Sequence, residues 1–184
     1  MNPLKRDSPD NSVPPPINMV LVNPKINDSF TDEHRRLIAK ISPVCYAYNF
    51  HLVLVNFKID VSPIDFATEM APSTSIGKSG ERLIELAKKS KISIEKLPLS
   101  KNLGKIIICT SRPNLRKLLK AKKMASIVNK EKIALVFGCD KKRNKNVRKL
   151  MQDAEYHLDI SEKGIELSLD SEIGAVTSII RTLK

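Results

Sequence analysis

The 184-residue sequence has little of several residue types on which common protein classes depend. It contains no tryptophan, 4% aromatic residues and only three cysteines, Cys45, Cys109 and Cys139. Their odd number and wide spacing argue against a disulfide framework and against a zinc cluster. Each cysteine lies in or beside an apolar stretch, so we expect buried thiols in a reducing compartment and a cytoplasmic location.

Long apolar runs and metal-ligand spacings are also missing. No run approaches the roughly 20 residues of a membrane-spanning helix, and no hydrophobic signal segment begins the sequence, so we expect neither membrane insertion nor export. His34, His51 and His157 lack the spacing of metal ligands, and no metal is expected. The sequence has no Gly-x-Gly-x-x-Gly loop, no recognisable Ser/His/Asp arrangement and no carboxylate cluster near the basic segment.

One phosphate-loop-like sequence is incomplete. Gly77-Lys78-Ser79 resembles the end of a P-loop, but the position that needs the motif's first glycine is Pro72. A helix is expected before it, where the motif requires a strand. A flexible glycine turn is the simpler interpretation, and a nucleotide enzyme that uses Lys78 and Ser79 is the weaker alternative.

What the sequence has in excess is positive charge, and this charge is local. The net charge is +12. Residues 101–149 hold sixteen Lys and Arg against two acidic residues, so this segment carries +14 and the rest of the chain −2. An evenly mixed charge run would indicate a solvated face. A segment of one sign favours a nucleic-acid partner.

Short apolar runs alternate with segments of helical periodicity. Strands are expected at residues 18–22, 52–55, 92–95, 106–109, 133–137 and 156–160, with helices at 32–48, 63–70, 83–89, 113–125, 146–154 and 173–183. Thr31 would cap the first helix, and Pro43 would kink it or split it in two. This alternation predicts an α/β fold with a mostly parallel sheet and helices on both faces. Residues 1–16, which end in three prolines, are predicted to be a disordered tail before one domain at 17–184.

The ends of three strands stand out as candidate ligand contacts, because open parallel sheets bind ligands at the carboxyl ends of their strands. Cys109-Thr110, Gly138-Cys139-Asp140 and the loop after Leu158 each place small or polar residues there. The last helix follows, with Ser168 or Asp170 as its cap and Glu172 near the positive end of its dipole.

The runs IIICTSRP (106–113), IALVFGCD (133–140) and LDISEKGIELSLDSEIGAV (158–176) resemble the C-terminal half of the SPOUT (SpoU–TrmD) RNA methyltransferases. The opening INMVLVNPKIND and AYNFHLVLV are similar to the first strands of that superfamily. The resemblance, to a divergent archaeal member, covers residues 17–184. It implies a deep C-terminal trefoil knot, S-adenosylmethionine bound in the knot, an RNA substrate and a homodimer.

Position by position, the resemblance also implies site residues. Arg112 and Ser168 are the candidate catalytic residues, and Leu167 and Leu169 would form apolar walls for the cofactor. The cofactor contacts would be Cys109, Thr110, Gly138, Asp140, Leu158, Glu166, Leu167, Ser168 and Leu169. The RNA contacts are expected from the charge and not from the resemblance, because the basic loops at 112–123 and 141–149 would hold the phosphates. They would be Arg112, Arg116, Lys117, Lys120, Lys123, Lys141, Lys142 and Arg143.

Two functions follow as hypotheses. The first is an S-adenosylmethionine-dependent methyltransferase that acts on structured RNA, either rRNA or tRNA. The second is a catalytically inactive RNA-binding or scaffold protein of the same fold. It is motivated by two departures from the family pattern, because the family's arginine would fall near Pro43 and its motif asparagine is Ser168. Arg35, Arg36 or Arg112 could supply the missing charge.

Overall fold

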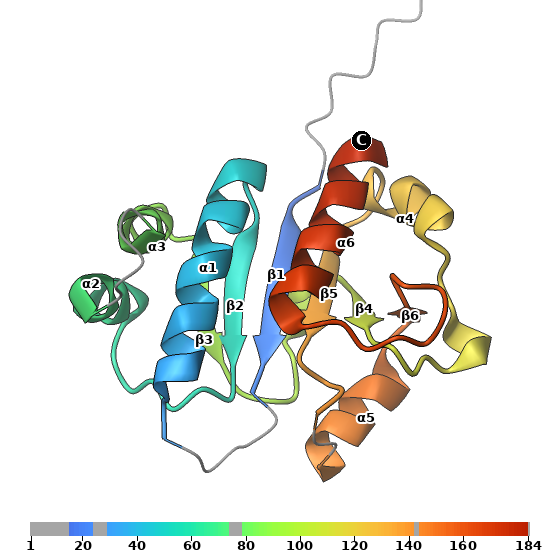
Figure 1. Ribbon diagram of the computed structural model, residues 1–184, viewed down its shortest axis with the longest axis horizontal. Helices are drawn as coiled ribbons and strands as arrows, with labels where there is room; N and C mark the ends of the chain where they lie inside the picture. Colours follow the sequence, from blue (N-terminus) through green and yellow to red (C-terminus); the bar gives the residue numbers. More distant parts are fainter. Residues whose placement is uncertain (1–14, 24–28, 74–78, 142–143, 184) are drawn as a thin grey trace, which may run out of the picture.

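The computed structural model describes residues 15–23, 29–73, 79–141 and 144–183. Within them a single sheet holds six strands in the order β3-β2-β1-β5-β4-β6, and every pairing is parallel (Figure 1). The strands are β1 Ile17–Val22, β2 His51–Val55, β3 Ile92–Glu95, β4 Lys105–Cys109, β5 Ile133–Phe137 and β6 Tyr156–Leu158. The predicted α/β class and parallel sheet are confirmed.

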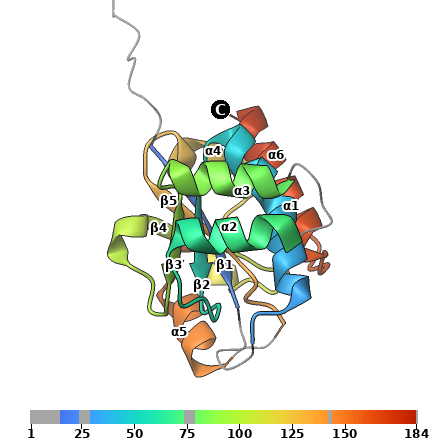
Figure 2. The same ribbon diagram turned by 90° about the vertical axis from the view of Figure 1, so that its left-hand side faces the viewer.

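Helices cover both faces of the sheet, but unevenly. They are α1 Asp32–Tyr48, α2 Pro63–Ser73, α3 Ser79–Lys88, α4 Ala121–Val128, α5 Lys145–Asp153 and α6 Leu169–Leu183. One face packs against α1, α2, α3, α4 and α6. The other face packs against α5 and the connection between β3 and β4. Figure 2 shows α1 and α6 to one side of the strands and α5 to the other.

The apolar strand runs explain why the sheet lies in the interior. In β1, Met19 and Leu21 point into the larger core while Val20 and Val22 point into the smaller one. All five residues of β5 are buried, as expected for a central parallel strand with both faces covered. Each of its four larger side chains contributes about 1.5–3 kcal/mol when fully buried.

The first helix begins as predicted but is not divided. The Thr31 side chain accepts a hydrogen bond from the backbone N–H of His34, whose ring accepts one from the N–H of Thr31. Helix α1 then runs through Pro43 to Tyr48 without interruption. The expectation that Pro43 could split it is wrong, because the buried residues on both sides of Pro43 hold the helix against the sheet.

Two further predicted elements are wrong in extent. The helix expected from Pro113 does not form, since a single 3₁₀ turn at Leu115–Lys117 is followed by a bridge between Leu118 and His157, and α4 begins only at Ala121. The last strand ends at Leu158, two residues early. Its continuation turns because Asp159 accepts hydrogen bonds from the backbone of the next residues.

The P-loop-like segment is only partly described. Gly77 and Lys78 lie outside the described residues, and Ser79 is the first residue of α3. Gly80 packs so closely on α2 that a Cβ there would lie 2.9 Å from the Cα of Ala71. This glycine is explained by helix packing, without a phosphate ligand.

Part of the expected organisation has no structural test. The tail predicted at 1–16 lies outside the described residues except for Pro15 and Pro16. Its boundary with the domain at 17–184 therefore stays a prediction. In the described part of the chain, no helix is long and apolar enough to cross a membrane.

Candidate functional site

The carboxyl ends of β4, β5 and β6 meet at one edge of the sheet. The N–H of Thr110 donates to the carbonyl of Leu158 at 2.9 Å, which joins the ends of β4 and β6. The Thr110 hydroxyl donates to the Asp140 carboxylate, and the Ser111 N–H donates to the same carboxylate at 2.9 Å. The three strand ends that the sequence singled out are therefore brought together.

Asp140 acts as a clamp between two of these strand ends. Its carboxylate also accepts from the Ser111 hydroxyl at 3.2 Å, and its carbonyl accepts from Arg112 Nη2 at 2.7 Å. Four groups of residues 110–112 thus hold the turn after β5. The Asp140 carboxylate therefore joins the turns that follow β4 and β5, and it adds a negative charge to this edge of the sheet.

A second carboxylate organises the loop after β6. The Asp159 side chain accepts from the N–H of Ser161 at 3.0 Å and from the N–H of Gly164 at 2.7 Å. A Cβ on Gly164 would lie 3.5 Å from the carbonyl of Ser111, so this loop runs beside the residues that follow β4. Figure 1 shows the loop passing from β6 to the first turn of α6 at this edge. Sequence reasoning missed Asp159, although an Asp-x-Ser sequence directly after a strand is a turn signal.

The first turn of α6 contributes a third acid, Glu172. Burial raises the pKa of the Glu172 carboxyl to about 7. Other carboxylates act in the same direction, namely those of Asp140, Asp159 and Glu166. Strong perturbation of a partly buried carboxyl in a loop cluster is a feature of functional sites. The sequence predicted only that Glu172 lies near the positive end of the helix dipole. It did not predict that other carboxylates lie nearby.

Cys109 lies beneath this group of acids. Its side chain is 1% exposed. Burial raises the pKa of its thiol well above the ordinary value, and Glu172, Cys139 and Asp140 act in the same direction. A neutral, enclosed thiol of this kind packs as an apolar group and is no nucleophile.

The predicted cofactor contacts therefore divide into two sets. The side chains of Cys109, Thr110 and Leu158 are buried, so a ligand would meet only their main chain. Glu166, Leu167 and Ser168 are exposed, and Leu169, Gly138 and Asp140 are intermediate. Whether these residues touch a cofactor stays a prediction.

Gly138 has an internal reason to be glycine. Its φ is +94°, and a Cβ would lie 2.4 Å from the carbonyl oxygen of Val22 at the end of β1. The backbone that approaches Gly138 closely is thus that of a neighbouring strand. The glycine therefore does not by itself indicate a ligand.

The two candidate catalytic residues are both engaged within the chain. Arg112 bonds to the Asp140 carbonyl, as above. The Ser168 hydroxyl bonds to that of Ser171 at 2.7 Å, and the Ser168 carbonyl accepts from the N–H of Glu172. Ser168 therefore stands at the start of α6, where a cap was expected.

Most of the predicted RNA contacts lie on the surface. Arg112, Arg116, Lys120, Lys123 and Lys141 are exposed, whereas Lys142 and Arg143 lie outside the described residues. Lys117 differs, because its ammonium group donates to the carbonyls of Gln152 and Ala154 at the end of α5. It stabilises that helix end through charge and hydrogen bonding.

Large apolar side chains are exposed near the same loops. Leu115 is 81% exposed and Ile165 is 55% exposed. Leu118 and Leu167 are also partly uncovered. Among the described residues, no group of His, Cys, Asp and Glu is arranged to hold a metal ion. The site thus combines an acidic centre, apolar flanks and basic surroundings.

These features can be compared with known proteins. The chain belongs to the family described as "Protein of unknown function (DUF531)", which matches residues 17–181. It is similar to "Uncharacterized protein MJ0224" of Methanocaldococcus jannaschii, with 28% identity over 164 residues that cover 89% of this chain and 92% of that one.

Two solved structures share the fold. One is a probable methylase family protein from Haemophilus influenzae Rd KW20, with a TM-score of 0.55, 17% identity and coverage of 91% of this chain and 65% of that one. The other is TrmJ from Z. mobilis ZM4, with a TM-score of 0.58, 14% identity and coverage of 94% and 70%. The chain thus spans about two thirds of the length of these two proteins. It shares their α/β fold, and at these identities the likeness concerns the fold alone.

Proposed function

We propose that this protein is an S-adenosylmethionine-dependent methyltransferase that acts on structured RNA, either rRNA or tRNA, as a homodimer. The observation that carries the proposal is the meeting of three strand ends with the first turn of α6, in a fold shared with two methylases. Open parallel sheets use this edge for ligands.

The donor set at this edge fits the charge of the cofactor. S-adenosylmethionine carries a sulfonium cation, and Asp140, Asp159 and Glu166, which lie near Glu172, give the site the opposite charge. The exposed Leu167 and the partly exposed Leu169 offer the apolar walls that a nucleoside needs. The bound cofactor would supply a methyl group, and the chain would hold and orient it.

The same geometry supports the proposed knot. The loop after β6 lies against the carbonyl of Ser111, and α6 returns to the sheet between α1 and α4. A C-terminal segment threaded beneath the connection after β4 would keep these contacts together. We include the trefoil knot in the proposal on that ground.

An RNA substrate is supported by the local charge. Arg112, Arg116 and Lys141 are exposed close in sequence to the strand ends that form the site. Phosphate contacts from such residues position a nucleic acid without reading its sequence. The acidic site would then bind the cofactor, and the basic surroundings would bind the phosphates of the RNA.

The alternative is an RNA-binding or scaffold protein of this fold that transfers no methyl group. It is favoured by the engagement of both catalytic candidates, since Arg112 bonds to Asp140 and Ser168 bonds to Ser171. It is also favoured by Pro43, which stands inside α1 near the position of the family's arginine.

Titration calorimetry with S-adenosylmethionine and S-adenosylhomocysteine tests the proposal. We expect binding, and we expect Leu167→Asp to abolish it while Leu115→Asp, a matched change of an exposed leucine, leaves it intact. Absence of binding by the wild-type protein would end the proposal. Labelled methyl transfer to total RNA then separates the enzyme from the inactive alternative, and light scattering reports the dimer.

A further inference from the structure

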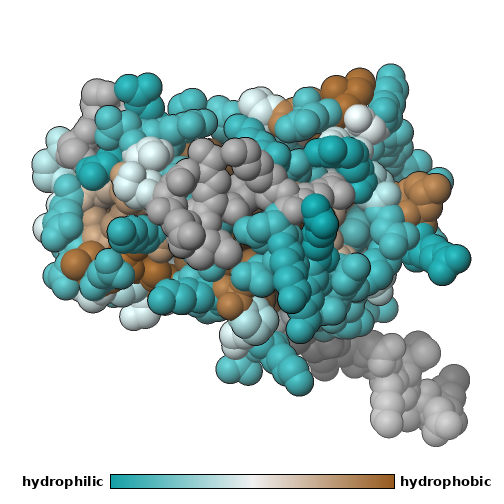
Figure 3. Space-filling model, turned by 90° about the horizontal axis from the view of Figure 1, so that it is seen from below, coloured by the Kyte–Doolittle hydropathy of each residue, from teal (hydrophilic) through white to brown (hydrophobic). Residues whose placement is uncertain are grey.

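A hollow among the described residues lies outside the site above. It is a cavity of about 220 Å³ between the first half of α1, the loop after β2 and helix α2. Figure 3 looks onto the edge of the sheet where the strands end, and it shows apolar surface on the α2 side. Because β2 also ends here, the hollow lies at the ligand-binding edge of a parallel sheet.

Aromatic residues are concentrated at this hollow. The chain has only five phenylalanines, and three of them, Phe30, Phe57 and Phe66, form one cluster. The rings of Phe30 and Phe66 are 5.5 Å apart at a steep angle. Phe57 and Phe66 are buried, whereas Phe30 is only partly covered. Three of the five phenylalanines of this aromatic-poor chain thus lie together, and Phe30 is the one that is partly exposed.

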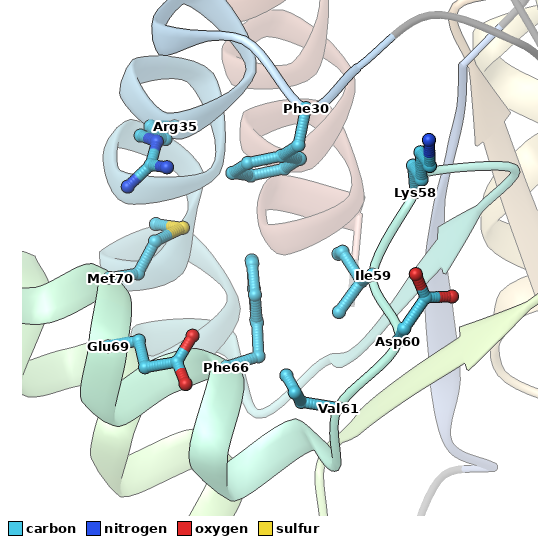
Figure 4. Close-up of a pocket in the computed structure, with 9 residues that line it drawn as sticks. All are labelled: Phe30, Arg35, Lys58, Ile59, Asp60, Val61, Phe66, Glu69 and Met70. Carbon is cyan, nitrogen blue, oxygen red and sulfur yellow. The ribbon is translucent and has the colours of Figure 1, made fainter.

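Charged groups of both signs border these rings. Figure 4 shows Arg35, Glu69 and Met70 on the helical side of the hollow and the loop residues 58–61 on the other. The Arg35 guanidinium lies 5.4 Å from the centroid of the Phe30 ring, and its side chain remains 37% exposed. Glu69 is exposed on α2. A ligand would therefore meet the partly covered Phe30 ring, the Arg35 guanidinium, which also pairs with Asp32, and the Glu69 carboxylate.

The volume of the hollow and the residues that line it favour a small planar ligand. Pockets for drug-sized ligands measure roughly 300–1,000 Å³, so this one suits a single heterocycle. Arginine donates to acceptors such as O6 and N7 of guanine, and a carboxylate accepts from its amino and imino groups. Aromatic side chains stack on bases that are not paired.

We propose that this hollow, built by Phe30, Phe66, Arg35 and Glu69, binds a guanine base. The base is either an unpaired nucleotide of RNA or a free guanine nucleotide. The RNA source depends on the proposed function, whereas binding of the free nucleotide does not.

Fluorescence anisotropy with short labelled RNA strands tests this site. The strands are uridine-only or carry one central guanine, adenine or inosine, which lacks the exocyclic amino group. We expect the guanine strand to bind roughly 5- to 100-fold more tightly than the uridine strand. Inosine should lose part of that gain. Guanosine monophosphate is then added to displace the guanine strand. If it displaces the strand at a concentration similar to that at which the strand itself binds, the ligand is the free nucleotide; if it does not, the ligand is a base within RNA.

Matched variants keep the test decisive. Phe30→Leu and Glu69→Ala should remove the guanine preference, whereas Phe50→Leu and Glu81→Ala, a buried phenyl and an exposed acid elsewhere, should retain it. Equal binding of all strands, or a preference that survives both pocket variants in folded protein, would overturn the proposal. Calorimetry with S-adenosylhomocysteine on the wild type and the same variants tests the proposed methyltransferase function separately. If the wild type does not bind S-adenosylhomocysteine, that function fails, while the guanine preference can still be measured.

Discussion

Glu172 is the residue at which burial and like charge act together. Its folded pKa of about 7 exceeds the ordinary value of 4.5, so the native state holds more protons than the unfolded state between these pH values. Stability therefore falls as pH rises from about 4.5 to 7 and stays reduced above that. We expect Glu172→Gln to raise the unfolding free energy at pH 8 by about 1–3 kcal/mol and to change it little at pH 4.5.

Urea denaturation at the two pH values measures this difference. Glu162→Gln is the control, because Glu162 is exposed in the adjoining loop. An equal effect of Glu172→Gln at both pH values would show that the carboxyl is not held neutral in the folded protein. The sign is the opposite of that for an acid in a salt bridge, whose folded pKa is lowered.

The three cysteines give a second prediction at this scale. Burial raises the pKa of Cys45 to about 12 and that of Cys109 well above its ordinary value, and no cysteine side chain is more than 1% exposed. We expect a thiol reagent at pH 8 to modify none of them quickly in native buffer and all three in urea. A Ser178→Cys variant, at an exposed position of α6, should react at once. Rapid labelling of a native cysteine in the wild type would contradict this burial.

Among the elements, Lys117 links two segments that the sequence could not connect. Because its ammonium caps α5, we expect Lys117→Met to lower the unfolding free energy by about 0.5–2 kcal/mol. Lys120→Met, at an exposed position, should change it by less than about 0.5 kcal/mol. Thermal and urea unfolding of both variants test this contrast, and equal stability losses would remove the capping role.

Elements were predictable where their signals are local. The buried runs of β4 and β5 and the periodicity of α1 and α6 were sufficient to place these elements. The parallel-sheet pattern also predicted that the ends of β4, β5 and β6 lie together. The helix predicted from Pro113 does not form before Ala121, and the reason is physical. Its backbone N–H groups at Asn114 and Leu119 donate to the ring and the carbonyl of His157, which is about forty residues away in sequence. The charges around Glu172 were hidden for the same reason, because Asp140 and Asp159 reach it only through the fold.

At the scale of the whole molecule, the sheet edge serves two proposed sites. The ends of β4, β5 and β6 face the start of α6, with acids at the centre. The end of β2 faces the phenylalanine hollow beside α1 and α2. An RNA that crosses this edge could place one base in the hollow while another nucleotide reaches the acidic site. Selection of the substrate would then depend on the spacing between two bases.

The charge distribution of the whole chain predicts how RNA binding depends on salt. Each phosphate contact that is lost reduces the slope of log affinity against log salt concentration by roughly 0.7–0.9. We expect Lys120→Gln combined with Lys123→Gln to reduce the slope measured by anisotropy, because both lysines belong to the segment of charge +14. Lys88→Gln combined with Lys96→Gln removes the same charge from exposed positions elsewhere and should leave the slope unchanged. If both pairs reduce the slope equally, net charge alone attracts the RNA. A reduction confined to the first pair would place the phosphate contacts on the segment of charge +14.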